Sequence, residues 1–539
     1  MAFYNPIARG VPPHAGASNR KEDCMRRSAT RVLFVTPELA PWARVGGLGE
    51  VSNDLPRALA AAGVDVRILV PAYPALIEAH PDATCVAEVP ALGALAPARL
   101  LEARGAVPIY LLDCAACYAR AGVYQSPDGA DWPDNHLRYG LLSRVAALLG
   151  STETPLAWHP QIVHCHDWQT GLTPAYLAHT MNASAATVMT LHNLAYQGNF
   201  PQHVLDELGL PQAAFSIEGL EYYGTVSFLK AGISYATLLT TVSRGYAREI
   251  QGPELGFGMD ELIRQRASDL TGISNGIDPE TWDPARDPHL AQNYGSRVEG
   301  KLENKLALQR ELGLAQDAEA PLFGMVARLA WHKGIDVMIE AAPAIVAMGA
   351  QIAVLGEGSR EIGEALCALA QRHPAAVAVR VGYEERLGHL VTAGADAFLL
   401  PSRYEPCGLT QLHCMRYGTL PVAHRTGGLG DSIVDATEDN VRARRATGFT
   451  FAPLTPETLI AAAERAVNTY RAREMWRVLQ AAAMLRDSSW RLAVPAYLAV
   501  YREAIVRKYP RRAERAAHVH LPAAARAAKP AEKRRRIRT

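Results

Sequence analysis

A carboxylate and a glycine pair follow two apolar runs of the sequence that are typical of neighbouring buried strands. Glu405 comes after the run 397–401, and Gly427 and Gly428 come after the run 420–424. Parallel strands deliver the residues that follow them to the same edge of a sheet. Glycines at the start of a helix let backbone N–H groups approach an anion. The two segments therefore predict an acid and an anion-binding loop side by side, which is typical of an active site.

Two cations follow a third strand-like run. Arg328 ends the run 322–328, and Lys333 begins a helical pattern five residues later, so both can reach one point beyond the strand. A guanidinium binds phosphate oxygens in pairs and an ammonium adds a compact charge, which suits a diphosphate. Two solvated surface cations are the alternative interpretation. The glycine pair downstream favours the diphosphate.

Two histidines, His164 and His166, lie on one face of the strand-like run 161–166, because side chains alternate along a strand. They can be metal ligands, structural histidines of the core, or groups that recognise sugar hydroxyls. No third ligand stands at a spacing that completes a metal site, which disfavours the first interpretation. The residues alone leave the other two open.

Further polar residues stand at predicted strand ends and loops. Asp134, Asn135 and Asn193 suit substrate contacts, although turns and caps are the commoner use of these residue types. Cys407 has no histidine at a spacing that indicates a catalytic pair, which favours packing over a thiolate nucleophile. Tyr383 either stacks on a base or packs in the core.

Strand-like runs alternate with helical patterns in two stretches of the chain, and this alternation is typical of parallel sheets covered on both faces. The first stretch begins at Arg31, and the second begins at Leu322. Each contains the string Gly-Gly-Leu-Gly, at 46–49 and at 427–430, and a segment rich in proline and aspartate, 277–288, separates them. The sequence predicts an α/β protein with two Rossmann-like, doubly wound domains that face each other across a cleft.

The chain divides accordingly into four predicted parts. Residues 1–29 form an N-terminal extension and residues 508–539 a basic tail, and both compositions predict disorder. Residues 30–290 form the first domain, and residues 291–507 form the second domain with its closing helices.

The composition excludes several classes of protein. Of the 539 residues, 49% are hydrophobic and 20% are charged, which is typical of a globular enzyme. The sequence contains neither an apolar run of the roughly 20 residues that cross a membrane nor a secretory signal, so we expect a cytoplasmic protein. Eight scattered cysteines indicate reduced thiols, and a net charge of +1 gives no general attraction to nucleic acid. We expect no cofactor and no metal.

The motifs resemble, in order, those of bacterial glycogen synthases and plant starch synthases over about residues 31–501. They are Arg44-Val-Gly-Gly-Leu-Gly, Val163-His-Cys-His-Asp-Trp, Leu191-His-Asn-Leu-Ala-Tyr-Gln-Gly, Phe228-Leu-Lys-Ala-Gly, Ser274-Asn-Gly-Ile-Asp, Arg328 to Gly334, and Pro401 to Gln411. The resemblance implies a GT-B fold and retaining transfer of glucose from ADP-glucose to the non-reducing 4-OH of an α-1,4-glucan.

The resemblance also implies roles for four residues. Arg328 and Lys333 hold the diphosphate and stabilise the leaving group, Glu405 lies by the donor glucose, and His166 lies beside the anomeric centre. The sequence leaves open whether Glu405 is a covalent nucleophile or an orienting group, and we favour orientation with attack on the same face. The residues predicted to bind substrates are Arg44, Gly46, Gly47, Asp134, Asn135, Asn193, Tyr383, Cys407, Gly408, Leu409, Thr426, Gly427 and Gly428.

The sequence departs from the family's pattern at two positions. Arg44 stands where lysine is usual, and Glu50 stands where aspartate is usual. Arginine keeps the charge but not the compact geometry, so donor binding is expected to survive with altered affinity or turnover.

Three rival functions fit parts of this pattern. They are a related enzyme with another nucleotide-sugar or acceptor, such as a UDP-glucose or maltose-forming transferase, a phosphorylase with pyridoxal phosphate on a lysine, and a non-catalytic glucan-binding or regulatory protein. The joint presence of His166, Arg328, Lys333 and Glu405 argues against the last of these.

Overall fold

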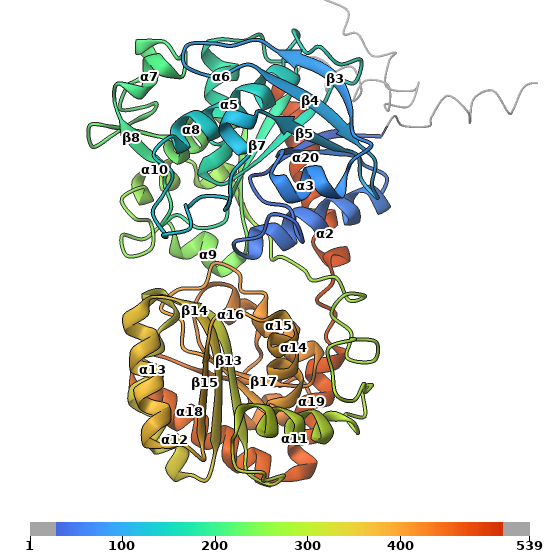
Figure 1. Ribbon diagram of the computed structural model, residues 1–539, viewed down its shortest axis with the longest axis vertical. Helices are drawn as coiled ribbons and strands as arrows, with labels where there is room; N and C mark the ends of the chain where they lie inside the picture. Colours follow the sequence, from blue (N-terminus) through green and yellow to red (C-terminus); the bar gives the residue numbers. More distant parts are fainter. Residues whose placement is uncertain (1–28, 510–539) are drawn as a thin grey trace, which may run out of the picture.

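The computed structural model describes residues 29–509 as two α/β bodies, each built around its own sheet (Figure 1). The strand order is β12-β11-β7-β6-β1-β2-β5-β4-β3 in the first sheet and β15-β14-β13-β16-β17-β18 in the second. Helices cover both faces of each sheet, as the alternating pattern predicts. The prediction of two Rossmann-like, doubly wound domains is confirmed. The two ends that were expected to be disordered lie outside the described residues, except for positions 29, 508 and 509. Of these three, position 508 is the last residue of a helix.

The first domain contains one large sheet, one small sheet and the helices around them. The strands of its large sheet are β1 (Arg31–Val35), β2 (Asp65–Pro71), β3 (Thr84–Val89), β4 (Ala98–Ala103), β5 (Ile109–Asp113), β6 (Ile162–His166), β7 (Ala186–Leu191), β11 (Leu238–Thr241) and β12 (Leu270–Gly272). A small separate sheet holds β8 (Asn199–Pro201), β9 (Glu221–Tyr222) and β10 (Thr225–Ser227). The helices are α2 (Gly47–Ala61), α3 (Pro74–Ala79), α4 (Ala115–Tyr118), α5 (Asn135–Leu149), α6 (Leu172–His179), α7 (Val204–Glu207), α8 (Phe228–Tyr235), α9 (Arg244–Glu249) and α10 (Asp260–Gln265).

The second domain repeats the strand and helix alternation. Its strands are β13 (Leu322–Leu329), β14 (Gln351–Gly358), β15 (Val377–Val381), β16 (Ala397–Leu400), β17 (Leu420–His424) and β18 (Phe449–Phe451). Its helices are α11 (Lys301–Leu312), α12 (Ile335–Ala347), α13 (Arg360–Arg372), α14 (Glu385–Gly394), α15 (Thr410–Arg416), α16 (Gly427–Ser432), α17 (Glu438–Arg442), α18 (Pro456–Arg471) and α19 (Arg473–Leu485). Both Gly-Gly-Leu-Gly strings therefore open a helix, α2 in the first domain and α16 in the second.

The first sheet is not parallel throughout, and this corrects the expectation of a purely parallel sheet. Strand β4 runs antiparallel to both β3 and β5. The connections at 90–97 and 104–108 contain no helix, and a return to a parallel neighbour needs a longer crossover. These short connections therefore explain why β4 is antiparallel to β3 and β5, its neighbours in the chain. The predicted site residues of this domain end or follow strands in the parallel part of the sheet.

The last helix, α20 (Val494–Lys508), returns to the first domain. It packs against β7, and its buried residues Tyr497, Val500 and Tyr501 belong to the core of the first domain (Figure 1). The Tyr501 hydroxyl lies 2.9 Å from Nδ1 of the buried His164. This differs from the expected grouping of 291–507 as one domain. An apolar helix face shows that a helix is buried, but it does not indicate which of two sheets covers it.

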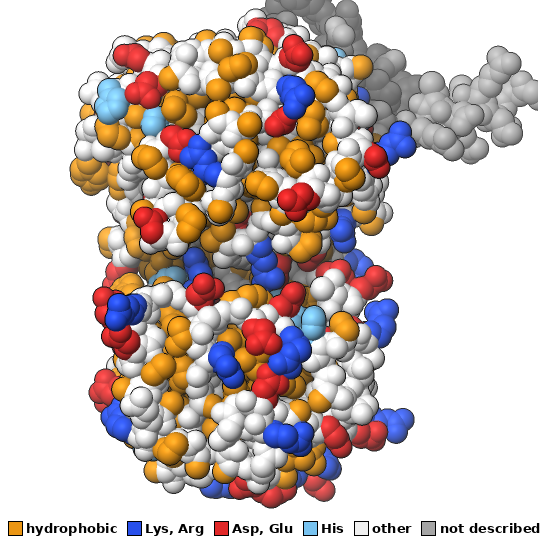
Figure 2. All heavy atoms as spheres, in the orientation of Figure 1, with side chains coloured by type: hydrophobic (Ala, Val, Ile, Leu, Met, Phe, Trp, Pro, Cys, Tyr) orange, Lys and Arg blue, Asp and Glu red, His pale blue; other side chains and the backbone are white. Residues whose placement is uncertain are grey.

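The strand order brings the predicted chemical groups to two facing edges. In the first sheet, β1, β6 and β7 are neighbours, so the loops after them lie together. In the second sheet, β13, β16 and β17 are neighbours, so the segments of Arg328, Glu405 and Gly427 also lie together. Figure 2 shows the hollowed waist between the two bodies, with charged and histidine side chains along it. Within residues 29–509, no helix is long and apolar enough to cross a bilayer.

Candidate active site

A half-buried ion pair joins the predicted acid to one of the predicted cations. Lys333 Nζ lies 2.6 Å from Glu405 Oε2, and the Ser402 hydroxyl donates a hydrogen bond of 3.0 Å to the same oxygen. The Glu405 side chain is only 12% exposed. Burial by itself raises the pKa of Glu405, but the Lys333 ammonium and these hydrogen bonds outweigh it and lower the pKa. Glu405 is therefore an anion at neutral pH.

Glycine at position 334 makes this ion pair possible. Gly334 has a φ of 64°, and a Cβ atom there would overlap with the backbone carbonyl of Pro401. Without a side chain, the turn that carries Lys333 can pack directly on the end of β16, from which the Glu405 loop departs. The sequence motif shows the glycine, but only the packing shows why a larger residue is excluded.

Arg328 lies near this pair on the exposed part of β13. Among residues 29–509 it has no ion-pair or hydrogen-bond partner from its side chain, so its guanidinium is available to a ligand. The neighbouring His332 is held neutral, since burial and the charges of Lys333 and Arg328 lower its pKa to about 4. The local field is thus positive, which favours a phosphate group.

His166, itself fully buried, ends β6 within a cluster of aromatic and imidazole rings. Its Nδ1 lies 2.9 Å from Nε2 of His192, and its ring packs on Phe34 with 4.0 Å between ring centroids. Burial, followed by the neighbouring histidines, lowers the pKa of His166 well below its usual value. Its Nε2 is buried without a hydrogen-bond partner among the described residues. An unpaired buried ring nitrogen is costly and suits a ligand group.

The other histidine of the motif is structural. His164 contacts Tyr501 through Nδ1 and the Thr190 hydroxyl through Nε2, at 2.9 and 2.6 Å. Within the described residues, no third side chain completes a metal site with His164 and His166. The two histidines therefore differ in role although they share one face of the strand.

Two residues that the sequence analysis did not select hold the loops of this edge. Asp167 has a φ of 57°, and its Oδ1 accepts the backbone N–H of His192 at 2.6 Å. Glu38 is buried, and its Oε2 accepts the N–H groups of Val45 and Gly46 at 2.8 and 3.0 Å. Burial raises the pKa of Asp167 to about 7, against its backbone hydrogen bonds. Asp167 lies within a motif that was recognised, whereas Glu38 carries no sequence signal beyond its place after β1.

The two domains touch around the loop of Glu405. The Ser243 hydroxyl donates a hydrogen bond of 2.5 Å to the backbone oxygen of Pro406. The Tyr404 hydroxyl lies beside the side chain of Asn193 in the first domain. Asn193, predicted as a substrate contact, thus lies beside the residue that precedes Glu405, although the two are more than two hundred residues apart in sequence.

The glycine loop of the first domain also faces the second domain. A Cβ atom at Gly47 would lie 3.5 Å from Leu409, and the Arg44 side chain lies beside Tyr383. Tyr383 is 55% exposed, so the alternative that it packs in the core is wrong. Four residues predicted to bind substrates therefore meet across the interface.

The predicted anion loop has partners inside the protein. The Gly427 N–H donates to Glu249 Oε1 at 2.7 Å, and the Thr426 hydroxyl donates to the same oxygen at 3.1 Å. The Gly428 N–H donates to the backbone oxygen of Glu405 at 3.0 Å. Glu249 belongs to α9 of the first domain and lines a hollow of about 190 Å³ between α9 and α16. A diphosphate can use the Gly427 N–H only after this carboxylate moves, so the predicted contact stays a prediction.

The glycines of this loop have a packing role as well. A Cβ atom at Gly427 would overlap with the backbone oxygen of Glu405, and one at Gly428 would overlap with that of Cys407. The small residues therefore allow α16 to support the Glu405 loop from behind.

Other predicted residues are occupied by neighbours in their own domain. The Asn135 side chain donates to the backbone oxygen of Tyr124 and accepts from Arg138. Asp134 forms a paired contact with Arg120, both distances being 2.9 Å. The backbone oxygens of Cys407 and Gly408 both accept hydrogen bonds from the Gln411 amide. Burial raises the pKa of Cys407 to about 12, which supports packing over a thiolate.

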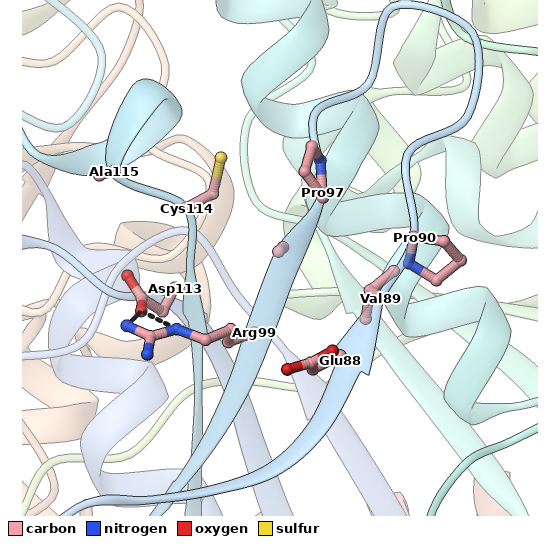
Figure 3. Close-up of a pocket in the computed structure, with 9 residues that line it drawn as sticks. Glu88, Val89, Pro90, Pro97, Arg99, Asp113, Cys114 and Ala115 are labelled. Carbon is pink, nitrogen blue, oxygen red and sulfur yellow. Dashed lines mark hydrogen bonds and ion pairs between the residues drawn. The ribbon is translucent and has the colours of Figure 1, made fainter.

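A larger hollow lies away from all of these residues. It encloses about 620 Å³ beside the antiparallel strands β3, β4 and β5, and the Arg99–Asp113 ion pair lies on its wall (Figure 3). No residue predicted to bind substrate lines it. The candidate site is therefore separate from this hollow.

Comparisons with known proteins identify the family of the chain. A model described as the starch synthase catalytic domain matches residues 31–265, and one described as glycosyl transferases group 1 matches residues 313–478. The glycogen synthase of Nitrosomonas eutropha is 48% identical over 88% of this chain and 96% of its own length. That of Dechloromonas aromatica is 47% identical over 89% and 99%.

The chain belongs to the glycogen synthase family. Among solved structures, the catalytic domain of starch synthase IV from Arabidopsis thaliana, bound to ADP and acarbose, matches with a TM-score of 0.80 at 30% identity, over 89% of this chain and all of that one. A sucrose-phosphate synthase from Thermosynechococcus elongatus shares the fold with a TM-score of 0.55 at 16% identity. The GT-B fold and the glycosyltransferase class predicted from the sequence are confirmed.

The two departures from the glycogen synthase pattern contact each other. Arg44 and Glu50 form an ion pair of 2.5 Å at the start of α2. Burial raises the pKa of Glu50, while the Arg44 charge acts in the opposite direction. The two residues that depart from the family's pattern, Arg44 and Glu50, are therefore partners in one ion pair.

We predict that Arg44→Lys keeps activity within about 10-fold, because the positive charge beside Glu50 remains. Arg44→Ala removes that charge and is expected to raise the KM for the donor about 10-fold or more, with a smaller change in kcat. Initial rates against donor concentration measure both constants. An unchanged donor KM in Arg44→Ala removes this residue from the site.

Proposed function

We propose that this glycogen synthase family member transfers glucose from ADP-glucose to the non-reducing 4-OH of an α-1,4-glucan, with retention of the anomeric configuration. The observation that carries this proposal is the half-buried Glu405–Lys333 pair, 2.6 Å apart, at the contact between two Rossmann-like domains. The related starch synthase structure that binds ADP and acarbose supports a nucleoside diphosphate donor and a carbohydrate acceptor.

Each charged residue has a proposed part in the transfer. Arg328 and Lys333 bind the diphosphate and stabilise the negative charge that develops on it as the glycosidic bond breaks. The Glu405 carboxylate, ionised at neutral pH, orients the donor glucose and stabilises positive charge at its anomeric carbon. The departing phosphate receives the proton of the acceptor hydroxyl on the same face, so the configuration is retained.

His166 is proposed to contact the donor sugar. Its Nε2 is the buried ring atom that has no hydrogen-bond partner among residues 29–509, and its other nitrogen is oriented by His192. Since burial keeps the ring neutral, it can hydrogen-bond a sugar hydroxyl without bringing a second positive charge to the anomeric carbon.

We propose that the domains move during the cycle. Donor phosphates reach the Gly427 N–H only when Glu249 leaves it, and Glu249 belongs to the opposite domain. Small shifts of one domain against the other change such contacts, and closure would exclude water from the reacting groups.

An ADP-release assay with paired donors tests the function. The purified chain is given ADP-glucose or UDP-glucose together with a glycogen primer, and diphosphate release and incorporated glucose are both measured. We expect release to depend on the primer and to be faster with ADP-glucose. Faster transfer from UDP-glucose contradicts the proposed donor, and absence of transfer from either donor contradicts the proposed activity.

A further inference from the structure

We propose that His289, Glu385 and His389 form a binding site for a divalent transition-metal ion of the zinc type. Each offers one ligand atom, and these atoms all lie within 4.8 Å of one another. Glu385 and His389 are one helical turn apart on α14, and His289 comes from the segment that connects the two sheets. The site lies outside the residues that hold the donor and does not depend on the proposed function.

The orientation of His389 is fixed by a buried carboxylate behind it. Asp287 Oδ2 lies 2.7 Å from Nδ1 of His389 and accepts the Tyr417 hydroxyl at 2.6 Å, while its Oδ1 accepts the backbone N–H of His289. A carboxylate only accepts hydrogen bonds, so Nδ1 carries the proton and Nε2 presents a lone pair. A carboxylate that orients a histidine in this way is the usual second partner of a metal ligand.

Stacking fixes the plane of the same imidazole. The Trp282 ring lies parallel to His389 at an angle of 7° and a centroid distance of 4.4 Å. Its position is in turn held by His413, at 3.6 Å and 12°. Two independent contacts thus orient one ligand before any ion binds, which lowers the entropy lost on binding.

The three ligand groups are free of other polar partners. Between residues 29 and 509, neither the His289 ring, nor the Glu385 carboxylate, nor Nε2 of His389 has a hydrogen-bond or ion-pair partner. Glu385 is exposed and His289 is half-buried, so both side chains can adjust toward an ion. The site thus combines one rigid ligand with two that can move.

The ligand types identify the class of ion. Two imidazole nitrogens and one carboxylate oxygen suit Zn²⁺ and similar ions, whereas Ca²⁺ and Mg²⁺ favour oxygen ligands. A bound ion would link the segment of His289, which connects the two sheets, to α14 of the second domain. It would also add positive charge near Glu50, which is coupled electrostatically to both His389 and Glu385 and is the partner of Arg44.

Titration of the chelator-treated full-length protein with Zn²⁺ tests the site. We expect the wild type to bind one equivalent of Zn²⁺. His289→Ala and Glu385→Gln should each lower the affinity for this ion by about 10–100-fold. His159→Ala is the control, because this exposed histidine lies outside the cluster. Every variant keeps all cysteines and the other histidines, so ions bound elsewhere contribute equally to each titration.

Cobalt distinguishes this site from the thiols of Cys114 and Cys117. Co²⁺ bound by nitrogen and oxygen gives visible absorption bands without the charge-transfer band of a thiolate. We expect those bands in the wild type and in His159→Ala, and their loss in His289→Ala. Circular dichroism checks that each variant is folded. The proposal is overturned if the wild type binds no Zn²⁺ or if His289→Ala binds it equally well. It is also overturned if the single bound Co²⁺ equivalent shows a thiolate band.

Discussion

Glu405→Gln is expected to lower kcat by about 10²–10³-fold, because it removes a negative charge that a preorganised site directs at the anomeric carbon. The amide has the same shape and can still accept the hydrogen bonds of Lys333 and Ser402, so the fold should be kept. The KM for ADP-glucose should change less than kcat, since the diphosphate contacts remain. Steady-state ADP release and a thermal unfolding curve measure these effects.

Glu384→Gln is a matched control for this variant. Glu384 lies in the same domain, pairs with Arg386 and is exposed, so its replacement should leave kcat unchanged. Near-normal turnover of Glu405→Gln would exclude the proposed role of the acid. Mass spectrometry of the wild type after incubation with donor alone separates the two possible roles. An orienting carboxylate gives no glucosylated peptide, whereas a covalent nucleophile gives one that contains Glu405.

Lys333→Met is expected to cause the second large loss, about 10²-fold in kcat, because it removes the charge beside both the acid and the proposed diphosphate. It should also shift the pH dependence. In the wild type the pKa of Glu405 is lowered, so the carboxylate stays ionised at neutral pH. Without the ammonium, burial dominates and raises this pKa. The acidic limb of kcat/KM should therefore move to higher pH.

The same change has a consequence for stability. A carboxyl group whose pKa is lowered by folding stabilises the protein above its unfolded pKa, and this contribution is lost as the pH falls through the folded pKa. In Lys333→Met the sign reverses, because a raised pKa favours the protonated folded form and stability falls as the pH rises. Unfolding midpoints at acidic and neutral pH measure this difference.

Two further variants separate catalysis from packing. Lys333→Arg keeps the charge and should recover part of kcat. Lys305→Met breaks another buried pair of the second domain, Lys305 with Asp396 at 2.8 Å, and should lower stability without moving the acidic limb. If Lys333→Met leaves the pH profile in place and only lowers stability, the pair is structural and the proposed role of Lys333 is wrong.

In the GT-B arrangement, each of the two domains supplies only part of the candidate site. Asn193 contacts Tyr404, Arg44 contacts Tyr383, and Leu409 faces Gly47. These contacts join residues from the two facing sheet edges. The activity is therefore expected to depend on how the two domains sit against each other as well as on the side chains themselves.

The sequence by itself determined the fold class, the main strands and the segments that carry the chemistry. Apolar runs such as 161–166 and 397–401 are local signals, and strands of this kind deliver their loops to one edge of a sheet whatever the rest of the chain does. For that reason Glu405 and Lys333 could be selected before any contact was known, whereas the role of His166 came from the family resemblance. Their motifs also carried the family resemblance.

Only the tertiary structure decided which side chains are free and which already have partners. His164 and His166 share one strand face, yet packing of α20 gives the first a structural role and leaves Nε2 of the second unpaired. Glu249 pairs with Gly427 from a distant helix of the other domain. Such contacts join residues far apart in sequence, and spacing along the chain carries no information about distances across an interface between two domains.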